Sequence, residues 1–569
     1  MYILWVSCFH HDASATLVKN GKIIAAVEEE RFTRKKHDKT FPKNAIQYCL
    51  KQAGININQV KYVGFYEKPL LKFERVIYQH LQTFPKSLKT FVKSTPDWFT
   101  EKLRFTKILK KQTKYKGNVL FINHHMSHAA STFLPSPFKK AAILIIDGVG
   151  EWTTTSYGIG NKNEIELIKE IKFPHSIGLL YSTITSFLGF KINNDEYKVM
   201  GLAAYGNPEK YYDQLKKLVK IEKDGSFKLN PKYFSYTYTD KMHSKKLIRL
   251  LGKPRKTENE ITQKHKNIAA SLQKITEEII ITILKQVYKI TKCESLVMAG
   301  GVALNSVVNG KILENTPFKK MWIQPNASDG GGSMGAALYI SNTILNKKRN
   351  QLENAYYGPE YSTKQIKKFL DEHEIKYKTL NETNLTKTTA KLIHENKIIG
   401  WFQGRMEWGP RALGNRSILA NPCNPEMKNV LNKKVKHRET FRPFAPAVCE
   451  EDAKKYFEIN GEIPEPSKYM LMIFPVKNNH QKKIPAITHV DRTARPQIIT
   501  KTTNPRYYEL IKKFGKLSKT PILINTSFNV KGEPIVCTPQ DAYNCFKNTG
   551  IDYLILNKFL IKKNDSKTT

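Results

Sequence analysis

The sequence predicts an α/β protein with two domains, and three observations support this prediction. The chain has 569 residues, which at about 150 residues per domain is enough for several hydrophobic cores. A pattern of strand, acidic loop and hairpin occurs twice in its first half. After a polar, charged stretch at 346–354, strands alternate with helices again. We therefore expect one domain at residues 1–350 and a second at residues 351–569.

The first copy of the pattern lies at the N-terminus. Residues 2–6 are apolar and predict a strand, and residues 15–18 predict a second strand after a polar turn. Asn20-Gly21 is a strong hairpin signal because both residues tolerate a left-handed backbone. Residues 22–27 are therefore the expected return strand.

The second copy begins with an apolar strand at 141–146, followed by an acidic loop that contains Asp147. Residues 153–159 and 165–171 are the expected hairpin strands, joined by a turn at 161–163. The two copies agree in the order of their elements and not in residue identity. They predict a duplicated α/β architecture.

Other segments complete the expected fold. Residues 207–265 are rich in lysine and tyrosine and predict a helical insertion, and residues 268–288 have apolar positions at helical spacing, which predicts a long helix. Further strands are expected at 295–298, 398–403, 521–525 and 552–555.

The charge of the chain first suggests a polyanionic partner. Its formal net charge is +43, from 93 Lys+Arg and 50 Asp+Glu, and such an excess is typical of proteins that bind nucleic acid or anionic membranes. Only 15 of the cations are arginine, however, and the lysines are spread along the whole chain, as on a solvated surface. Seven arginines lie between residues 405 and 495, and guanidinium groups match phosphate and carboxylate oxygens. This distribution favours a small anionic ligand.

The cysteines and the apolar runs exclude several classes of protein. The seven cysteines form no C-x-x-C pair, which argues against a disulfide framework or a zinc ribbon. The N-terminus lacks the basic region of a signal peptide, and no apolar run approaches the roughly 18 residues of a membrane span. We expect a cytoplasmic protein with no membrane partner.

His124 and His128 form the sharpest local signal. If the segment is helical, the two side chains lie one turn apart on the same face and can chelate one metal ion. A capped helix start with satisfied histidines is an equally good interpretation. A third ligand from Asp147 or Asp329 would favour the metal, and two histidines with a carboxylate suit Fe²⁺ or another divalent ion.

Two glycine-rich loops favour a nucleotide or another anion. Residues 326–337 lead into a helix, and Gly300-Gly301 follows the strand expected at 295–298. Glycine lets the backbone approach a phosphate, and a helix N-terminus presents free N–H groups. Tight packing is the alternative explanation for each loop.

A third set of polar side chains lies in the second half. Residues 404–417 place three arginines in glycine-rich turns, and residues 525–529 follow a predicted strand, where α/β folds bind ligands. A surface salt-bridge network is the alternative, but few carboxylates lie nearby in the sequence to build it.

Several motifs occur together and in order along the chain. They are His11-Asp12-Ala13-Ser14-Ala15, Glu28 to His37, the pair His124/His128, Asp195 to Leu202, the Asp329 loop and Trp408-Gly409-Pro410-Arg411-Ala412-Leu413-Gly414. In this combination the chain resembles the NodU/CmcH family of O-carbamoyltransferases over nearly its whole length. The resemblance implies an N-terminal domain with the actin/Hsp70-like ATPase fold, of Kae1-like type, and a C-terminal YrdC-like domain.

The resemblance also implies a reaction in two steps. The YrdC-like domain would make carbamoyl adenylate from carbamoyl phosphate and ATP, which binds with Mg²⁺. The Kae1-like domain would transfer the carbamoyl group to a hydroxyl of a small-molecule natural product, with a divalent metal, Fe²⁺ by resemblance. An aminoglycoside, a macrocycle, a Nod-type oligosaccharide and a guanidinium toxin scaffold are all open as acceptor, and a homodimer is open as well.

The resemblance and the chemistry of the residues together give each candidate residue an expected role. His11, Asp12 and Lys36 are the expected catalytic residues, of which His11 or Asp12 would take the acceptor's proton, and His124, His128, Asp147 and Asp329 are the expected metal site. The expected nucleotide-binding residues are Gly300, Gly301, Asn305, Gly330, Gly331, Ser527 and Asn529. The expected carbamoyl phosphate-binding residues are Arg411, Arg416, Arg438, Arg442, Arg492, Arg495 and Asn525, with Arg492 and Arg495 as alternatives for one contact.

A different class of function is a Kae1/YrdC-like protein that binds or modifies tRNA. The Trp-Gly-Pro-Arg motif at 408–411 and the absence of a single run of lysines argue against it. An inactive scaffold is a third class, and the intact histidine, aspartate and arginine sets argue against that one.

Overall fold

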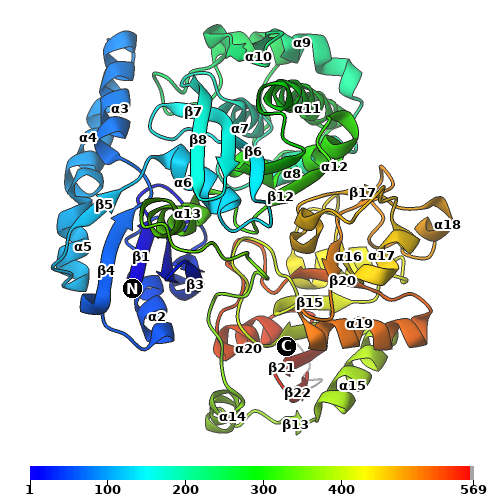
Figure 1. The fold of residues 1–569 in the computed structure, drawn as a ribbon. Coiled ribbons are helices and arrows are strands. Elements are labelled where there is room, and N and C mark those ends of the chain that lie inside the picture. Colours follow the sequence, from blue (N-terminus) through cyan, green and yellow to red (C-terminus); the bar gives the residue numbers. More distant parts are fainter. Residues whose placement is uncertain (564–569) are drawn as a thin grey trace. The chain divides into compact units, whose positions relative to one another are not determined.

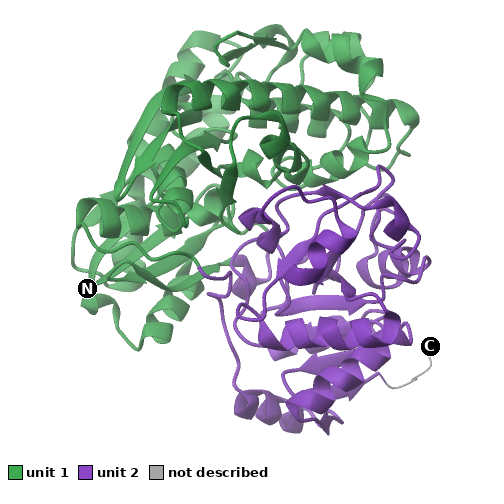
Figure 2. Ribbon diagram, turned by 45° about the vertical axis from the view of Figure 1, so that its right-hand side comes forward, with its two compact units in different colours: residues 1–29, 37–352 green, residues 30–36, 353–569 purple. Residues whose placement is uncertain are grey.

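The computed structural model describes residues 1–563, and these residues form two compact units (Figures 1 and 2). Unit 1 contains residues 1–29 and 37–352. Unit 2 contains the chain from Glu353 onward together with residues 30–36. No sequence feature indicated that the short segment 30–36 belongs with the second half of the chain.

Unit 1 contains two five-stranded sheets with the same topology. Their strand orders are β3-β2-β1-β4-β5 and β12-β11-β6-β7-β8. In each sheet an antiparallel three-stranded meander places its first strand next to two further parallel strands. This confirms the predicted duplicated α/β architecture of the actin/Hsp70-like type. The strands are β1 (Tyr2–Ser7), β2 (Ser14–Lys19), β3 (Lys22–Glu28), β4 (Val60–Phe65), β5 (Val119–Phe121), β6 (Lys140–Ile146), β7 (Thr153–Asn161), β8 (Glu164–Lys172), β11 (Ser295–Ala299) and β12 (Lys320–Ile323).

The predicted hairpin at Asn20-Gly21 is confirmed. Asn20 and Gly21 have φ angles of 49° and 84°, the left-handed pair that joins two strands with the natural sheet twist. Only glycine fits the second position for a further reason, since a Cβ atom at Gly21 would meet the backbone oxygen of Lys348. The turn is therefore set by its local residues and also by its neighbours in space.

The helices of unit 1 include two that carry or support the predicted metal ligands. α6 (His124–Phe133) packs against α13 (Gly332–Leu338), and α13 also contacts β1 and β2. The other helices of four or more residues are α1 (Glu30–Thr33, in unit 2), α2 (Lys43–Ala53), α3 (Pro69–Thr83), α4 (Leu88–Thr100), α5 (Phe105–Thr113), α7 (Ile177–Phe187), α8 (Glu196–Ala203), η3 (Pro208–Tyr211), α9 (Tyr212–Lys216), α10 (Lys245–Leu251), α11 (Gln263–Thr291), η5 (Gly301–Leu304), α12 (Ser306–Asn315) and η7 (Tyr339–Ile344).

The helix expected at 268–288 is longer than its apolar pattern indicates, because Thr262 begins it with a capping box and a left-handed Lys292 ends it. The expectation of a helical insertion at 207–265 is wrong in part. This segment contains short helices and also a two-stranded sheet of β9 (Val219–Ile221) and β10 (Phe227–Leu229). Three-residue strands are too short to show a period in the sequence.

Unit 2 is built on one mixed sheet of eight strands in the order β13-β22-β21-β14-β15-β20-β16-β19. Helices α15 and α19 pack together over a core of buried apolar side chains from both helices and the central strands. This is the second α/β domain expected from the sequence. The sheet strands are β13 (Lys378–Thr379), β14 (Ile399–Phe402), β15 (Arg416–Ala420), β16 (Ala445–Cys449), β19 (Gln497–Ile499), β20 (Ile522–Ser527), β21 (Tyr553–Leu556) and β22 (Phe559–Lys562).

The remaining elements of unit 2 connect these strands. They are α14 (Thr363–Glu372), α15 (Glu382–His394), α16 (Met427–Val430), η8 (Leu431–Lys436), α17 (Glu450–Tyr456), η9 (Glu465–Tyr469), β17 (Phe474–Pro475), α18 (Asn478–Gln481), β18 (Thr493–Ala494), α19 (Pro505–Ser518) and α20 (Pro539–Lys547). Among the residues that the structure describes, no helix combines the length and the apolar character needed to cross a membrane. All seven cysteines of the chain lie within the described residues 1–563, and none of them is in a disulfide.

Candidate functional site

Four predicted metal ligands converge in unit 1. The side chains of His124, His128, Asp147 and Asp329 are all buried. The Nε2 atoms of His124 and His128 lie 3.1 Å apart, and Asp147 Oδ2 lies 2.9 Å from His124 Nε2. Asp329 Oδ1 lies 3.4 Å from His128 Nε2 and 3.6 Å from His124 Nε2. Residues far apart in the sequence therefore present two nitrogen and two oxygen donors to one point.

Local structure explains how each donor reaches this point. The segment from His124 to His128 is the first turn of α6, as the four-residue spacing requires. Glu151 caps this helix, because its carboxylate accepts hydrogen bonds from the backbone N–H of His124 at 2.9 and 3.1 Å. Asp147 directly follows β6, and Asp329 begins the short 3-10 turn η6 (Asp329–Gly331) that leads into α13.

The spacing of these donors fits a divalent cation. Two ligand atoms that each lie about 2.1 Å from one ion are about 3 to 3.4 Å apart. Asp329 Oδ1 is buried and has no hydrogen-bond partner in the part of the chain that the structure describes, as is expected of an atom that binds a cation. The neighbouring His125 differs, since its Nδ1 is hydrogen-bonded to Ser156 at 2.7 Å. His125 is therefore directed at Ser156 and is not one of the four clustered donors.

Electrostatics in the cluster also favour a bound cation. Burial disfavours the charged forms, but the carboxylates of Asp329 and Asp147 outweigh it and raise the pKa of His124 well above its usual value. In turn, against the effect of burial, His11 and His124 hold the pKa of Asp329 well below its usual range. The carboxylates and the imidazoles therefore stabilise each other's charged forms, and a divalent cation would supply the same positive charge to the carboxylates.

The predicted catalytic residues His11 and Asp12 lie beside this cluster. His11 Nε2 is 3.6 Å from Asp329 Oδ2, and its Nδ1 is 2.9 Å from Asp12 Oδ2. Burial lowers the pKa of His11, but Asp329 and Asp12 overcome this effect and raise it to about 9. Asp12 Oδ1 also lies 2.6 Å from His37 Nδ1, so the carboxylate orients both imidazoles.

Sequence reasoning gave no role to two histidines of this region. His10 Nδ1 lies 3.4 Å from Asp329 Oδ2, and His37 extends from Asp12 to Asn194, whose Oδ1 is 2.8 Å from His37 Nε2. The signal for His10 was its position next to His11. Adjacent side chains normally diverge, but the left-handed backbone at Phe9 and Asp12, with φ angles of 67° and 53°, lets both imidazoles approach Asp329.

The glycine-rich loops of unit 1 differ from each other. Gly301 is exposed, and its backbone N–H donates to Asp147 Oδ1 at 3.1 Å. This loop is therefore accessible next to the metal-type cluster of His124, His128, Asp147 and Asp329. Gly330 and Gly331 are buried, and a Cβ atom on either would meet Asn326. These two glycines therefore allow close packing of the loop against Asn326. The Asn305 side chain caps α12 by accepting from the backbone N–H of Val308 and also pairs with Gln273.

Four of the predicted arginines gather in unit 2. Arg411 lies in the loop before β15, Arg438 and Arg442 follow η8, and Arg495 lies between β18 and β19. Burial lowers the pKa of Arg495 well below its usual value, and the charges of the other three arginines lower it further. Such mutual repulsion is characteristic of a site that binds an anion. Arg492 is exposed in a turn, so Arg495 is the member of that pair that joins the cluster.

Lys436 belongs to the same cluster and was missed by sequence reasoning. It is 3% exposed, and its ammonium group donates to the backbone oxygens of Ser527 and Asn529 at 2.8 and 2.7 Å, and to Asn529 Oδ1 at 2.7 Å. Burial, followed by the charges of Arg438, Arg442 and Lys36, holds its pKa well below the usual value. In the sequence, Lys436 could not be distinguished from the many other lysines along the chain.

Lys36 lies in unit 2, where its charge acts on Lys436 in the cluster of arginines. Its segment is held there by Arg31, which donates to the backbone oxygen of Gly409 at 2.9 Å, and by Arg34, which donates to those of Ile535 and Pro534 at 2.7 and 2.8 Å. The sequence placed Lys36 in the first domain with His11 and Asp12. The structure places it in a different unit from them.

Arg416 does not fit the predicted contact with carbamoyl phosphate. Its side chain is fully buried, and its two terminal nitrogens donate to the backbone oxygens of Gln403, Gly404, Asn415 and Pro359. The guanidinium also stacks on the ring of Phe402, with 3.6 Å between them. Its two terminal nitrogens are engaged within the fold, so Arg416 stabilises the loop that carries Arg411. Asn525 is likewise buried and donates to Gln497 and Ala412, with its own Oδ1 unpartnered.

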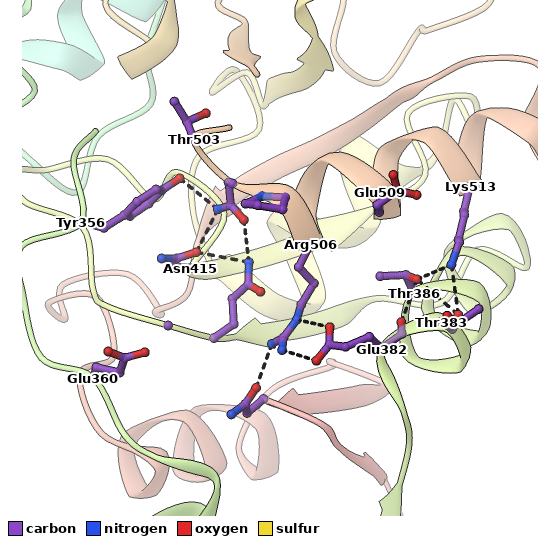
Figure 3. Close-up of a pocket in the computed structure, with 15 residues that line it drawn as sticks. Tyr356, Glu360, Glu382, Thr383, Thr386, Asn415, Thr503, Arg506, Glu509 and Lys513 are labelled. Carbon is purple, nitrogen blue, oxygen red and sulfur yellow. Dashed lines mark hydrogen bonds and ion pairs between the residues drawn. The ribbon is translucent and has the colours of Figure 1, made fainter. Parts of the chain in front are cut away.

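A separate cavity of about 670 Å³ opens elsewhere in unit 2 (Figure 3). Its inner wall is a hydrogen-bonded set formed by Tyr356, Gln403, Asn415 and Asn504. At its rim Arg506 forms an ion pair with Glu382, and Lys513 donates to Thr386 (Figure 3). None of the predicted site residues lines this cavity.

Fold and sites together define an α/β protein with a metal-type cluster in one unit and an anion-type cluster in the other. The family model for the carbamoyltransferase N-terminus matches residues 2–338, and the model for the carbamoyltransferase C-terminus matches residues 390–563. The chain therefore belongs to the carbamoyltransferase family and is a transferase enzyme, as its motifs indicated.

Several known proteins are similar to this chain in sequence or in structure. An uncharacterized protein of Synechocystis sp. is 45% identical and covers 99% of this chain and 97% of its own length. Nodulation protein NolNO of Sinorhizobium fredii is 36% identical over 98% of this chain and 79% of its own. Among solved structures, component A of (R)-2-hydroxyglutaryl-CoA dehydratase from Acidaminococcus fermentans covers 61% of this chain and 99% of its own, with 13% identity and a TM-score of 0.33.

Proposed function

We propose that this protein is an ATP-dependent O-carbamoyltransferase with one half-reaction in each unit. In unit 2, carbamoyl phosphate and water would give carbamate and phosphate, and the carbamate oxygen would attack the α-phosphorus of Mg²⁺-bound ATP. This step releases pyrophosphate and forms carbamoyl adenylate. In unit 1, an acceptor hydroxyl would attack the carbamoyl carbon, which forms the carbamate ester and releases AMP.

The observation that carries this proposal is the gathering of Arg411, Arg438, Arg442, Arg495 and Lys436 in unit 2. Carbamoyl phosphate is a dianion and ATP carries more charge still, and preorganised guanidinium donors stabilise the charge that develops as phosphate groups depart. Ser527 and Asn529 would bind phosphate oxygens next to Lys436, which already contacts both residues. Lys36 lies close enough to contribute to the same site.

In unit 1, His124, His128, Asp147 and Asp329 would hold a divalent cation, for which Fe²⁺ is our proposal. When bound, this ion acts as a Lewis acid toward the carbamoyl oxygen. His11 and Asp12 lie on the side of Asp329 that faces away from this ion, and we propose that they activate the acceptor hydroxyl. Gly301 offers an accessible loop position for the phosphate of the adenylate, whereas Gly300, Gly330 and Gly331 are buried.

The acceptor is proposed to be a small molecule with a free hydroxyl. A nodulation protein is among the relatives, and the carbamoyltransferase family defines the group that is transferred. We propose action in a reducing compartment such as the cytoplasm, because none of the seven cysteines, all within the described residues, forms a disulfide.

Separate assays of the two half-reactions test this proposal. Incorporation of labelled pyrophosphate into ATP should depend on carbamoyl phosphate, and Arg442→Met or Arg495→Met should lower its rate by at least 100-fold. His128→Asn should retain this exchange and lose carbamoyl transfer to an acceptor. A matched control is Arg492→Met, since Arg492 lies outside the cluster. Release of ADP in place of AMP, or exchange that survives in Arg495→Met, would contradict the proposed mechanism.

A further inference from the structure

The carboxylate of Asp329 faces a pair of histidines with each of its two oxygens. Oδ1 lies 3.4 Å from His128 Nε2 and 3.6 Å from His124 Nε2, within the cluster described above. Oδ2 lies 3.4 Å from His10 Nδ1 and 3.6 Å from His11 Nε2. The two sets of distances are the same, although only the first pair was expected to bind a metal.

We propose that His10, His11 and Asp329 form a second divalent-cation site, bridged by Asp329 to the first, so that unit 1 holds a dinuclear metal centre. The three ligand atoms lie within 4.8 Å of one another. Atoms bound to one cation at about 2.1 Å are about 3 to 3.4 Å apart, so small movements of the two imidazoles would complete the site. Bridging carboxylates commonly hold two metal ions about 3.5 to 4 Å apart.

The unused bonding capacity of His10 supports this site. Its Nδ1 is buried from solvent and has no hydrogen-bond partner among residues 1–563, although it lies 3.4 Å from Asp329 Oδ2. A buried ring nitrogen without a hydrogen-bond partner, directed at a carboxylate, can serve as a metal ligand.

The hydrogen bond on the far side of His11 supports the site as well. Its Nδ1 lies 2.9 Å from Asp12 Oδ2, the carboxylate–histidine arrangement that fixes a metal-binding imidazole and leaves Nε2 for the ion. Asp12 is oriented in turn by His37, which lies 2.6 Å from its other oxygen.

The second cation would deepen the proposed function, on which its chemical role rests. It would bind the acceptor through the hydroxyl oxygen, because that side of Asp329 faces His11 and Asp12 and the two histidines are partly exposed. Coordination lowers the pKa of a hydroxyl, which makes it a better nucleophile at neutral pH. The acceptor class would then be an alcohol small enough to reach a dinuclear site.

Metal counting tests the proposal without reference to activity. The full chain is stripped of metal, loaded with Co²⁺ under anaerobic conditions, desalted and analysed for metal per chain. We expect two ions in the wild type, one in His10→Gln, one in His128→Gln and two in the control His394→Gln, an exposed histidine of α15. Magnetic coupling between the two Co²⁺ ions should be visible by electron paramagnetic resonance and should disappear in both single-site variants.

The outcomes separate the second site from the first. One ion in the wild type, retained by His10→Gln and lost by His128→Gln, would overturn the dinuclear centre and leave the proposed function intact. No bound ion in the wild type would overturn both. If His10→Gln fails to fold by circular dichroism, His11→Gln removes a ligand of the same site, and the wild-type stoichiometry decides the question by itself.

Discussion

Glu407 shows how one buried side chain organises the loop that carries Arg411. Its Oε1 accepts hydrogen bonds from the backbone N–H groups of Leu413, Asn415 and Arg416 at 2.7, 2.8 and 3.1 Å. The residue is 4% exposed, so these bonds are made in a poorly solvated environment, where charged hydrogen bonds are strong. Glu407 therefore gives this loop its shape.

Replacement of Glu407 by alanine should destabilise unit 2. Loss of one carboxylate leaves three buried N–H groups without a partner, and we expect a fall of about 3 kcal/mol in the free energy of unfolding. Urea denaturation followed by fluorescence measures this change. Glu426→Ala, at an exposed site, should change the free energy by less than about 0.5 kcal/mol. Equal effects of the two substitutions would contradict this role of Glu407.

Lys436 should matter for chemistry more than for folding. Lys436→Met keeps an aliphatic chain in the buried space and removes the charge next to Ser527 and Asn529. We expect the carbamoyl phosphate-dependent exchange of pyrophosphate into ATP to fall by about 100-fold. Lys433→Met, on the exposed surface of η8, should leave the exchange rate unchanged. The position of Lys436 in the fold, and nothing in its sequence context, distinguishes the two lysines.

At the scale of elements, two helices determine where the metal-type cluster forms. α6 carries His124 and His128, and Asp329 lies in the turn directly before α13. The helices approach closely at Gly335, where an added Cβ atom would meet the backbone oxygen of Ser127. A small residue is therefore required for the two elements to bring their ligands together.

Gly335→Ala should weaken metal binding without touching a ligand. The extra methyl group forces α13 away from α6, which we expect to cost about 1 to 3 kcal/mol of stability and to lower Co²⁺ affinity at least tenfold. Isothermal titration calorimetry gives the affinity. Gly54→Ala is the control, because its left-handed φ of 64° costs about 1 kcal/mol on substitution while no atom lies within 4 Å of the new Cβ. Wild-type affinity in Gly335→Ala would show that helix separation does not set the ligand geometry.

At the scale of the whole molecule, the net charge of +43 separates into two parts. Many of the lysines on exposed helices form ion pairs at the surface, for example Lys367 with Asp371 and Lys274 with Glu209. Exposed pairs of this kind contribute little to stability or recognition. The clustered arginines of unit 2, by contrast, are partly buried and repel one another.

This distribution of positive charge, with dispersed lysines and one cluster of arginines, predicts weak and nonspecific RNA binding. A fluorescent RNA oligonucleotide should bind with low affinity at about 50 mM salt and lose at least 1,000-fold in affinity by about 200 mM, because dispersed lysines act only through counterion release. Fluorescence anisotropy measures this dependence, and ATP with carbamoyl phosphate should not compete. Saturable binding that persists at 200 mM salt would favour the tRNA-binding alternative.

The sequence by itself determined the local elements and the chemical class of this protein. Alternating apolar residues, the Asn20-Gly21 turn and the spacing of His124 and His128 depend on neighbours in the chain, and periodicity records such neighbours directly. The ordered motifs also indicated the carbamoyltransferase family, which the family models confirm. Short strands such as β9 and β10 lay below the length at which a period can be seen.

Only the tertiary structure decided which of the marked residues act together. In the structure Lys36 lies in unit 2, and Lys436 lies with the arginines. The terminal nitrogens of Arg416 bind backbone oxygens within the fold, and His10 lies next to Asp329. These outcomes depend on contacts between residues up to hundreds of positions apart. Such contacts arise from packing and from the need of buried polar groups for partners, neither of which leaves a local pattern in the sequence.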